Sequence, residues 1–455
     1  MKPAPAAAAA PTETRLSRVF SLLFGAFLGL ALLKFGNVAI MERFIEWPSN
    51  GWEWLINTWP VAIGLWLLGA LGLVGIFAAR WDMSAPRWLV ALPLVWLGWQ
   101  FVSATHTLDA ALTQATLRHF CACVVCFYLG MFALGRRGNM SLFLLSLGAG
   151  LCVVIAVGLE QHFGGLEESR RYFFTYVYPQ SPNVPPEFLK KIKSDRIWAT
   201  LFYPNALAGV LLLFLPAILT GIWVELATRF TTGARAFLLV LVGGGGLACL
   251  YWSGSKGGWL LMLLLGMTAL LRAPVATRWK VALIGLVLAG GLAGFALRYA
   301  GYFERKATSV SARLDYWRAA FQTVVAHPVF GTGPGTFAIP YQAIKRPESE
   351  MARLVHNDYL QQASDSGLVG FLAFAGLVVT TLVRTRPRAV DAGISLRFAV
   401  WLGVLGWSLQ GVLEFGLYIP ALAWSAFSLM GWLLATTTAK PFDKPAPASY
   451  AGVRK

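Results

Sequence analysis

Residues 201–223 read LFYPNALAGVLLLFLPAILTGIW, and no charged side chain interrupts them. A helix needs about 20 mostly apolar residues to cross the roughly 30 Å hydrocarbon core of a bilayer. Inside lipid, helices and closed barrels are the structures that satisfy their own backbone hydrogen bonds. The stretch therefore predicts a transmembrane helix.

Similar stretches recur along a chain whose composition is far from that of a soluble protein. Hydrophobic residues make up 57% of the 455, and charged residues 13%, more apolar than a soluble core of this size requires. The expected fold class is all-α, a polytopic integral membrane protein with about twelve transmembrane helices. We place them at residues 18–40, 60–79, 88–104, 115–134, 141–160, 201–223, 236–252, 258–272, 280–297, 366–383, 398–414 and 417–436.

The distribution of Lys and Arg predicts the orientation of these spans. One set of short loops carries most of the basic residues, while the opposite short loops carry only Arg43 and Lys256. Because loops rich in Lys and Arg stay in the cytoplasm, both termini are expected inside. The net charge of +17 is then mainly a topology signal that also suits anionic membrane lipids, and nothing in it calls for nucleic acid.

The chain divides into three expected parts. Residues 1–17 are rich in Ala and Pro and are expected to form a disordered cytoplasmic N-terminus. Residues 18–439 form the transmembrane domain, and residues 440–455 form a polar cytoplasmic tail. Two long connections, about 161–200 and 298–365, fall on the periplasmic side, and loops of this length are usually functional or folded in their own right.

The second long loop is expected to contain a helix and a glycine turn. Apolar residues recur from Leu314 to Val325 at spacings of three and four, which predicts a helix over residues 311–326. Such a helix could lie in the membrane interface, cap a cavity or simply pack. The glycines of GTGPG at 331–335 predict a turn rather than a phosphate loop, because the Lys-Ser/Thr of that motif is missing.

Several polar residues are candidates for chemistry at the outer membrane boundary. His356 stands in the segment HNDYL, where it could act in catalysis or cap the tenth span. Arg196 closely precedes the span that begins at Tyr203. Cations near outer helix ends, such as Arg118 and Lys256, are costly without a purpose, although snorkelling to headgroups is an alternative explanation.

Taken together, four segments resemble the O-antigen ligases and the related O-antigen polymerases and bacterial O-oligosaccharyltransferases. The segments are RLDYW at 313–317 with the glycine turn that follows, HN at 356–357 with GLVG after nine further residues, PN at 204–205, and SGSKGG at 253–258. The last more often has Arg after Ser in the family. Lys256 keeps the charge there but lacks the bidentate fork of a guanidinium.

The resemblance implies a GT-C-like membrane glycosyltransferase with its active site at the periplasmic face of the bacterial inner membrane. Its donor would be an undecaprenyl-pyrophosphate-linked polysaccharide, its acceptor a sugar hydroxyl of lipid A–core, and its product lipopolysaccharide. A polymerase or a protein O-oligosaccharyltransferase would share the donor and differ in the acceptor. A transporter or lipid flippase fits the helix count, but its polar residues should gather near the bilayer midplane.

The resemblance also suggests roles for individual residues. His356 is expected to act as general base, since a histidine can accept a proton near neutral pH. Fixed cations are expected to bind the pyrophosphate leaving group: Arg196, Arg313 and Lys256, with Arg118 behind them. The expected supporting residues are Tyr316, Trp317, Asn357 and Asn205. No cofactor or metal is expected, so the transfer would be metal-independent and inverting.

Overall fold

The computed structural model describes residues 14–81, 86–134, 137–180, 184, 189, 192–304, 308–347, 349–387 and 395–438, and its ordered elements in this part of the chain are helices. The C-terminal tail predicted at 440–455 and residues 1–13 of the predicted N-terminal segment lie outside these residues. The first helix, α1 (Arg15–Lys34), begins three residues before its predicted start. Thr14 caps it by accepting a hydrogen bond from the Ser17 backbone at 3.2 Å.

Long apolar helices indicate a multi-pass membrane protein. In the described part of the chain, eight are long and apolar enough to cross a bilayer: Arg15–Lys34, Val61–Ala78, Ala110–Ala133, Asn139–Val177, Pro204–Thr228, Thr232–Ser253, Thr277–Tyr299 and Asp358–Thr385. They correspond to α1, α3, α5, α6 with its extension, α9, α10, α12 and α15.

Helices also lie at the other four predicted spans. They are α4 (Arg87–Ala104), α11 (Lys256–Arg272), α16 (Leu396–Gln410) and α17 (Pro420–Thr438). They are outside the set of eight, and the count of twelve spans stays a prediction.

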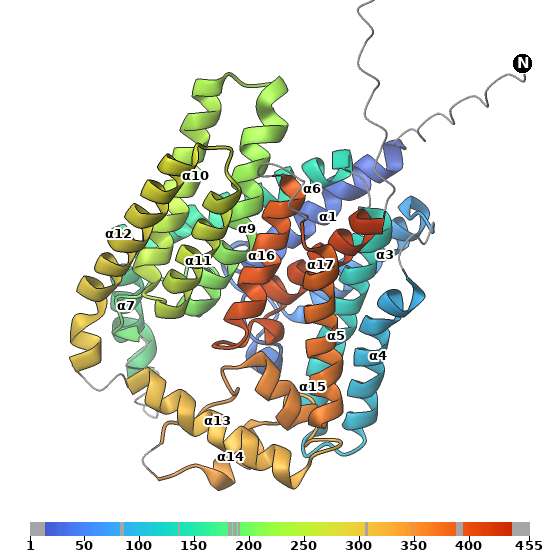
Figure 1. Ribbon diagram of the computed structural model, residues 1–455. Coiled ribbons are helices and arrows are strands. Elements are labelled where there is room, and N and C mark those ends of the chain that lie inside the picture. The colour runs from blue at the N-terminus through green and yellow to red at the C-terminus, as the bar shows by residue number, and fades with distance from the viewer. Residues whose placement is uncertain are drawn as a thin grey trace, which may run out of the picture.

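The helices form one bundle around α9 (Pro204–Val224), whose residues from Ala206 to Leu215 are all buried. Pro204 occupies the first turn of α9, where its missing N–H costs no hydrogen bond. α16 and α10 pack against α9, α1 packs against α6 (Arg137–Glu160), and α17 packs against α5 (Ala110–Tyr128). α12 (Thr277–Glu304) lies at the edge of the bundle (Figure 1), and its apolar window has no buried residue.

The predicted loop helix is confirmed as α13 (Thr308–Ala326), which lies with α14 (Ala338–Ile344) across one end of the bundle (Figure 1). Its apolar stripe faces outward: Leu314 is 56% and Phe321 63% exposed. Tyr316, Ala319 and Ala320 form the buried face instead. Ala319 and Ala320 are small enough to let α13 approach the rest of the molecule closely. The stripe of large apolar residues therefore predicted the helix but not its buried face.

The two predicted long loops contain more helix than expected. After α6 the chain kinks at Phe163 and Gly164, continues as further helix through Val177 and ends in a short turn at Tyr178–Gln180. In the second loop, α15 (Asp358–Thr385) begins eight residues before the predicted span and bends at Gly367, where φ is +69°.

The glycine turn predicted at 331–335 is confirmed, and it packs against this bend. The backbone N–H of Gly333 donates to the carbonyl of Asp365 at 2.8 Å, and that of Gly335 donates to the Asp365 carboxylate at 2.8 Å. A Cβ on Gly367 would lie 1.9 Å from the carbonyl oxygen of Val329. The positive φ and the close approach of the Val329 carbonyl together explain why residue 367 is glycine.

Candidate active site

His356 is held immediately before the first turn of α15. Its backbone adopts a left-handed conformation, with φ at +56°. Asn357 caps the helix: its Oδ1 accepts hydrogen bonds from the backbone of Tyr359 and Leu360, each at 3.0 Å. The imidazole is 29% exposed and lies between Tyr316, stacked at 5.7 Å, and Phe415, edge-on at 4.7 Å. The ring is therefore fixed in place but still accessible.

Glu414 is the partner of this histidine. One carboxylate oxygen lies 3.2 Å from Nδ1 of His356, and the other accepts hydrogen bonds from Arg313 and, at 2.6 Å, from Nδ2 of Asn205. The Glu414 side chain is 11% exposed. It lies in the turn after α16, which ends at Gln410 and not at the predicted boundary of 414. Glu414 is therefore absent from the residues that the sequence predicts for the site. The available signal is a carboxylate at the last position of the predicted span 398–414.

The environment of Glu414 favours its charged form. Burial raises the pKa of the carboxyl, but the hydrogen bond to His356 and the charges of His356, Arg313 and Arg196 outweigh it, so the pKa lies below its usual range. The carboxylate is thus ionised at neutral pH. It can accept the Nδ1–H of His356 and leave Nε2 as the basic nitrogen.

Backbone contacts position the Glu414 turn against α15. The N–H of Asp358 donates to the carbonyl of Gly411 at 2.7 Å. The Asp358 carboxylate accepts the backbone N–H of Leu417 at 3.0 Å. Both ends of the turn are thereby tied to the first residue of α15, so His356 and Glu414 face each other.

Arg196 extends the network to two further elements. Its Nη2 donates to Oδ1 of Asn205 at 2.8 Å, and its Nε donates to the carbonyl of Ser253 at 2.7 Å. Asn205 therefore connects Arg196 to Glu414. Gly254, with φ at +61°, leaves room for the guanidinium, since a Cβ there would lie 3.1 Å from Nε of Arg196. This accounts for the glycine between Ser253 and Ser255.

Lys256 and Arg298 add two more cations to this region. Lys256, the first residue of α11, lies over the ring of Tyr299 at 5.0 Å, and Arg298 lies over the same ring at 5.9 Å. The charges of Arg196 and Arg313 act on Lys256. We call Arg196, Lys256, Arg298 and Arg313 the cation cluster. In the contacts between described residues, Glu414 binds one member of the cluster, Arg313.

The other predicted site residues have different positions. Asn357 acts on the helix cap, and Asn205 bridges Arg196 to Glu414. Trp317 packs against the small core below α13, and no described residue accepts a hydrogen bond from its buried indole N–H. Arg118 is exposed on α5, where its charge acts on Glu42, and no described contact joins it to the cation cluster. The described contacts thus connect Tyr316, Arg313, Asn205 and Arg196 to His356 directly or through Glu414, whereas none connects Trp317 or Arg118 to it in either way.

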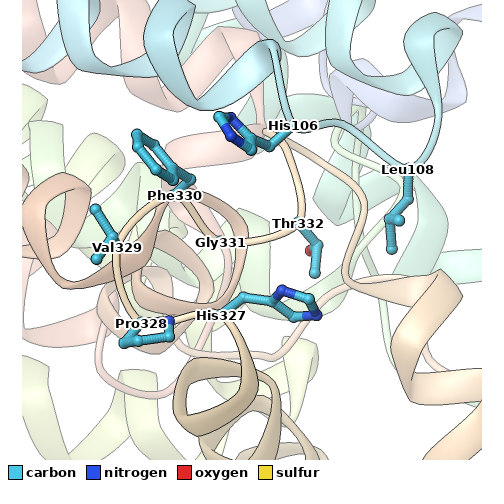
Figure 2. A pocket seen from close by; sticks show the side chains of 8 residues that line it. All are labelled: His106, Leu108, His327, Pro328, Val329, Phe330, Gly331 and Thr332. Carbon is cyan, nitrogen blue, oxygen red and sulfur yellow. The ribbon is translucent and has the colours of Figure 1, made fainter.

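Of two cavities bordered by described residues, the larger has neither His356 nor Glu414 in its lining. A small cavity of about 10 Å³ borders Asn205, Gln410, Glu414 and Phe415, enough for about one water. A cavity of about 410 Å³ lies between the α4–α5 connection and the glycine turn (Figure 2). It is lined mostly by apolar atoms, and its histidines are not joined to a carboxylate by any described contact. We therefore place the candidate site at His356. In the described residues, no group of three or more His, Cys, Asp or Glu side chains could hold a metal ion.

Part of the chain matches a known protein family. Residues 236–375 match the family model described as O-Antigen ligase. This chain carries an O-antigen ligase domain. Proteins of this family are typically membrane glycosyltransferases that act on lipid-linked glycans, and they include ligases, polymerases and O-oligosaccharyltransferases. The O-antigen ligase domain contains Lys256, Arg313 and His356, whereas Arg196 and Glu414 lie outside the matched residues.

The chain is also similar to an uncharacterized protein of Haemophilus influenzae. The two are 28% identical over 153 residues, which cover 29% of this chain and 38% of that protein. The chain thus matches well under half of the relative's length.

Proposed function

We propose that this protein is an O-antigen ligase of the bacterial inner membrane. It transfers an undecaprenyl-pyrophosphate-linked polysaccharide to a sugar hydroxyl of lipid A–core at the periplasmic face. The observation that carries the proposal is the pair of His356 and Glu414 beside the cation cluster. A base and an excess of fixed positive charge are what glycosyl transfer from a lipid pyrophosphate requires.

His356 acts as the general base. Glu414 accepts the Nδ1–H, orients the ring and stabilises the imidazolium that forms, while Nε2 takes the proton of the acceptor hydroxyl. The hydroxyl oxygen attacks the anomeric carbon, and the bond from that carbon to the pyrophosphate oxygen breaks. The pyrophosphate leaves with the electron pair, and attack from the opposite side inverts the anomeric centre.

The cation cluster stabilises the leaving group. Guanidinium forks match the paired oxygens of a phosphate, and preorganised charges act where negative charge develops in the transition state. Arg196 and Arg313 already contact Asn205 and Glu414, which fixes their positions before substrate binds. Together with Lys256, Arg196 and Arg313 offset the negative charge of the departing pyrophosphate.

The positions of these groups favour an interfacial enzyme over a transporter. His356 precedes α15, Glu414 follows α16, and Lys256 begins α11. A transporter site should instead lie near the middle of its spans. The ligase and its relatives share donor and chemistry, so the acceptor decides between them.

Lipopolysaccharide gels of a deletion strain test the function. Loss of the long polymer with accumulation of lipid-linked chains is expected for a ligase. Attachment of a single repeat would instead identify a polymerase, and unchanged lipopolysaccharide would exclude both activities.

The base is tested in the purified protein. His356→Ala should lower the rate of transfer by about 10²–10⁴, and His356→Asn, which keeps hydrogen bonding without basicity, should not restore it. His162→Ala, at an exposed histidine, is the matched control. Transfer by His356→Ala at the wild-type rate would remove His356 from the mechanism.

A further inference from the structure

Arg43 has no part in the mechanism above. It and Lys256 are the two basic residues of the predicted outward short loops, and Lys256 belongs to the cation cluster. Arg43 instead meets Arg353 at the ring of Phe44, where the two guanidinium carbons lie 4.8 and 5.4 Å from the ring centre. All three side chains are exposed. We call Arg43 and Arg353 the outer arginine pair.

The neighbouring carboxylate is engaged elsewhere. Glu42 accepts the backbone N–H groups of Val61 and Ala62, at 2.9 and 3.4 Å, at the start of α3. Among the described residues, no salt bridge includes Arg43 or Arg353. Two exposed guanidinium groups therefore lie near one ring, and no carboxylate in the described salt bridges neutralises either of them, so both are available to an anion. Phosphate oxygens are the ligands that such groups bind best.

A short series of contacts connects the pair to the catalytic histidine. The charge of Arg353 acts on Tyr203. Tyr203 packs edge-on against Phe415 at 5.3 Å, and Phe415 packs edge-on against His356 at 4.7 Å. Beyond His356 the series continues to Glu414 and the cation cluster. His356 therefore stands between two groups of cations along this series.

We infer that Arg43 and Arg353 bind a phosphate group of the acceptor glycolipid. This inference rests on the proposed function and goes beyond it, because it assigns the acceptor an anionic group and a site. The donor pyrophosphate occupies the cation cluster, the acceptor phosphate occupies the outer arginine pair, and the accepting hydroxyl lies between them at His356. A neutral glycan acceptor would leave the outer pair without a ligand.

The test compares one acceptor with and without its phosphates. Wild-type protein in phosphatidylcholine nanodiscs receives saturating donor and either native or chemically dephosphorylated lipid A–core. Arg43→Ala and Arg353→Ala should each raise KM for the native acceptor by about tenfold, with kcat and the donor KM little changed. Dephosphorylation should raise the wild-type KM similarly, and the substitutions should then add nothing. Arg346→Ala, at an exposed arginine of the same loop, should behave as wild type.

The opposing outcomes are distinct. Equal changes in KM for both acceptors, or no change, would overturn the assignment. An effect that appears only when phosphatidylglycerol is added, and equally with both acceptors, would assign the pair to lipid headgroups instead.

Binding of native lipid A–core alone, without donor, separates this inference from the proposed function. Weaker binding by Arg43→Ala and Arg353→Ala supports the phosphate site even if no transfer follows. Transfer that is independent of acceptor phosphate would support the proposed function and reject the site.

Discussion

At the scale of single residues, Glu414 joins groups from several parts of the chain. It contacts His356 from the segment before α15, Arg313 from α13 and Asn205 from α9. A carboxylate with three such partners is costly to bury unless all of them stay in place. In the proposed mechanism, these contacts position His356 and Arg313.

We predict that Glu414→Gln lowers kcat by about tenfold or more, because a neutral amide stabilises the imidazolium less. The acceptor KM should change little, and the acid limb of the pH–rate profile should move, since the charge beside the base is gone. Glu46→Gln, at an exposed carboxylate, is the control. An unchanged pH profile and kcat would show that the carboxylate charge plays no part.

The contacts of Arg196 lead to a second prediction. Arg196→Ala should reduce kcat more than Arg196→Lys does, because lysine keeps the charge but loses the contacts with Ser253 and Asn205. Lys256→Arg should be tolerated, as the family segment often has arginine there. Steady-state kinetics with lipid-linked donor measure both. Equal rates for the Ala and Lys variants would mean that Arg196 does not act on the developing charge.

At the scale of elements, α15 begins next to the candidate base His356 and also carries the backbone groups that bind the glycine turn. The bend at Gly367 exposes backbone that the 328–333 segment uses: the N–H of Leu368 donates to the carbonyl of Pro328 at 2.8 Å. Ser103 of α4 also donates to the carbonyls of Phe330 and Asp365, at 2.7 and 3.0 Å. These hydrogen bonds join α15, α4 and the glycine turn at one end of the bundle.

We predict that Gly367→Ala lowers the melting temperature in detergent by about 5 °C or more, because alanine is strained at a positive φ and would overlap the Val329 carbonyl. Gly376→Ala in the same helix is the control. A Cβ there meets nothing within 4 Å, and alanine favours helix, so stability should be kept or raised. Equal melting temperatures for both variants would contradict the bend as a structural constraint.

At the scale of the whole molecule, the distribution of charge predicts one orientation in the membrane. Basic residues dominate one set of loops, and α13 and α14 lie across one end of the bundle (Figure 1). If the basic loops are cytoplasmic, residues 308–347 face the periplasm. The candidate site then meets lipid-linked sugars at the outer leaflet.

Cysteine labelling of intact spheroplasts tests this orientation. With the five native cysteines replaced, Gln342→Cys in α14 should react with an impermeant maleimide. Thr228→Cys, which is also exposed, should react only after the membrane is opened. The reverse pattern would invert the topology and remove the site from the periplasm.

The sequence alone determined the all-α fold class and suggested most residues of the candidate site. Short sequence patterns predict the apolar spans, the loop helix and the glycine turn, because periodicity and turn residues act over a few neighbours. Short segments also contain the candidates His356 and the arginines. The sequence could not reveal which face of α13 is buried or that Arg118 has no described contact with the cation cluster. Both facts depend on how helices that are distant in the sequence pack against each other.

Only the tertiary structure decided that Glu414 is the partner of His356. The two are 58 residues apart, and Asn205, which shares the same carboxylate, is 209 residues from it. The sequence places Glu414 at the end of a predicted span, and a carboxylate at that position does not by itself indicate its partner. The packing of α16 on α9 and the backbone contacts between Asp358 and the turn bring these groups together. Such contacts are set by the whole bundle, so no short window of sequence contains them.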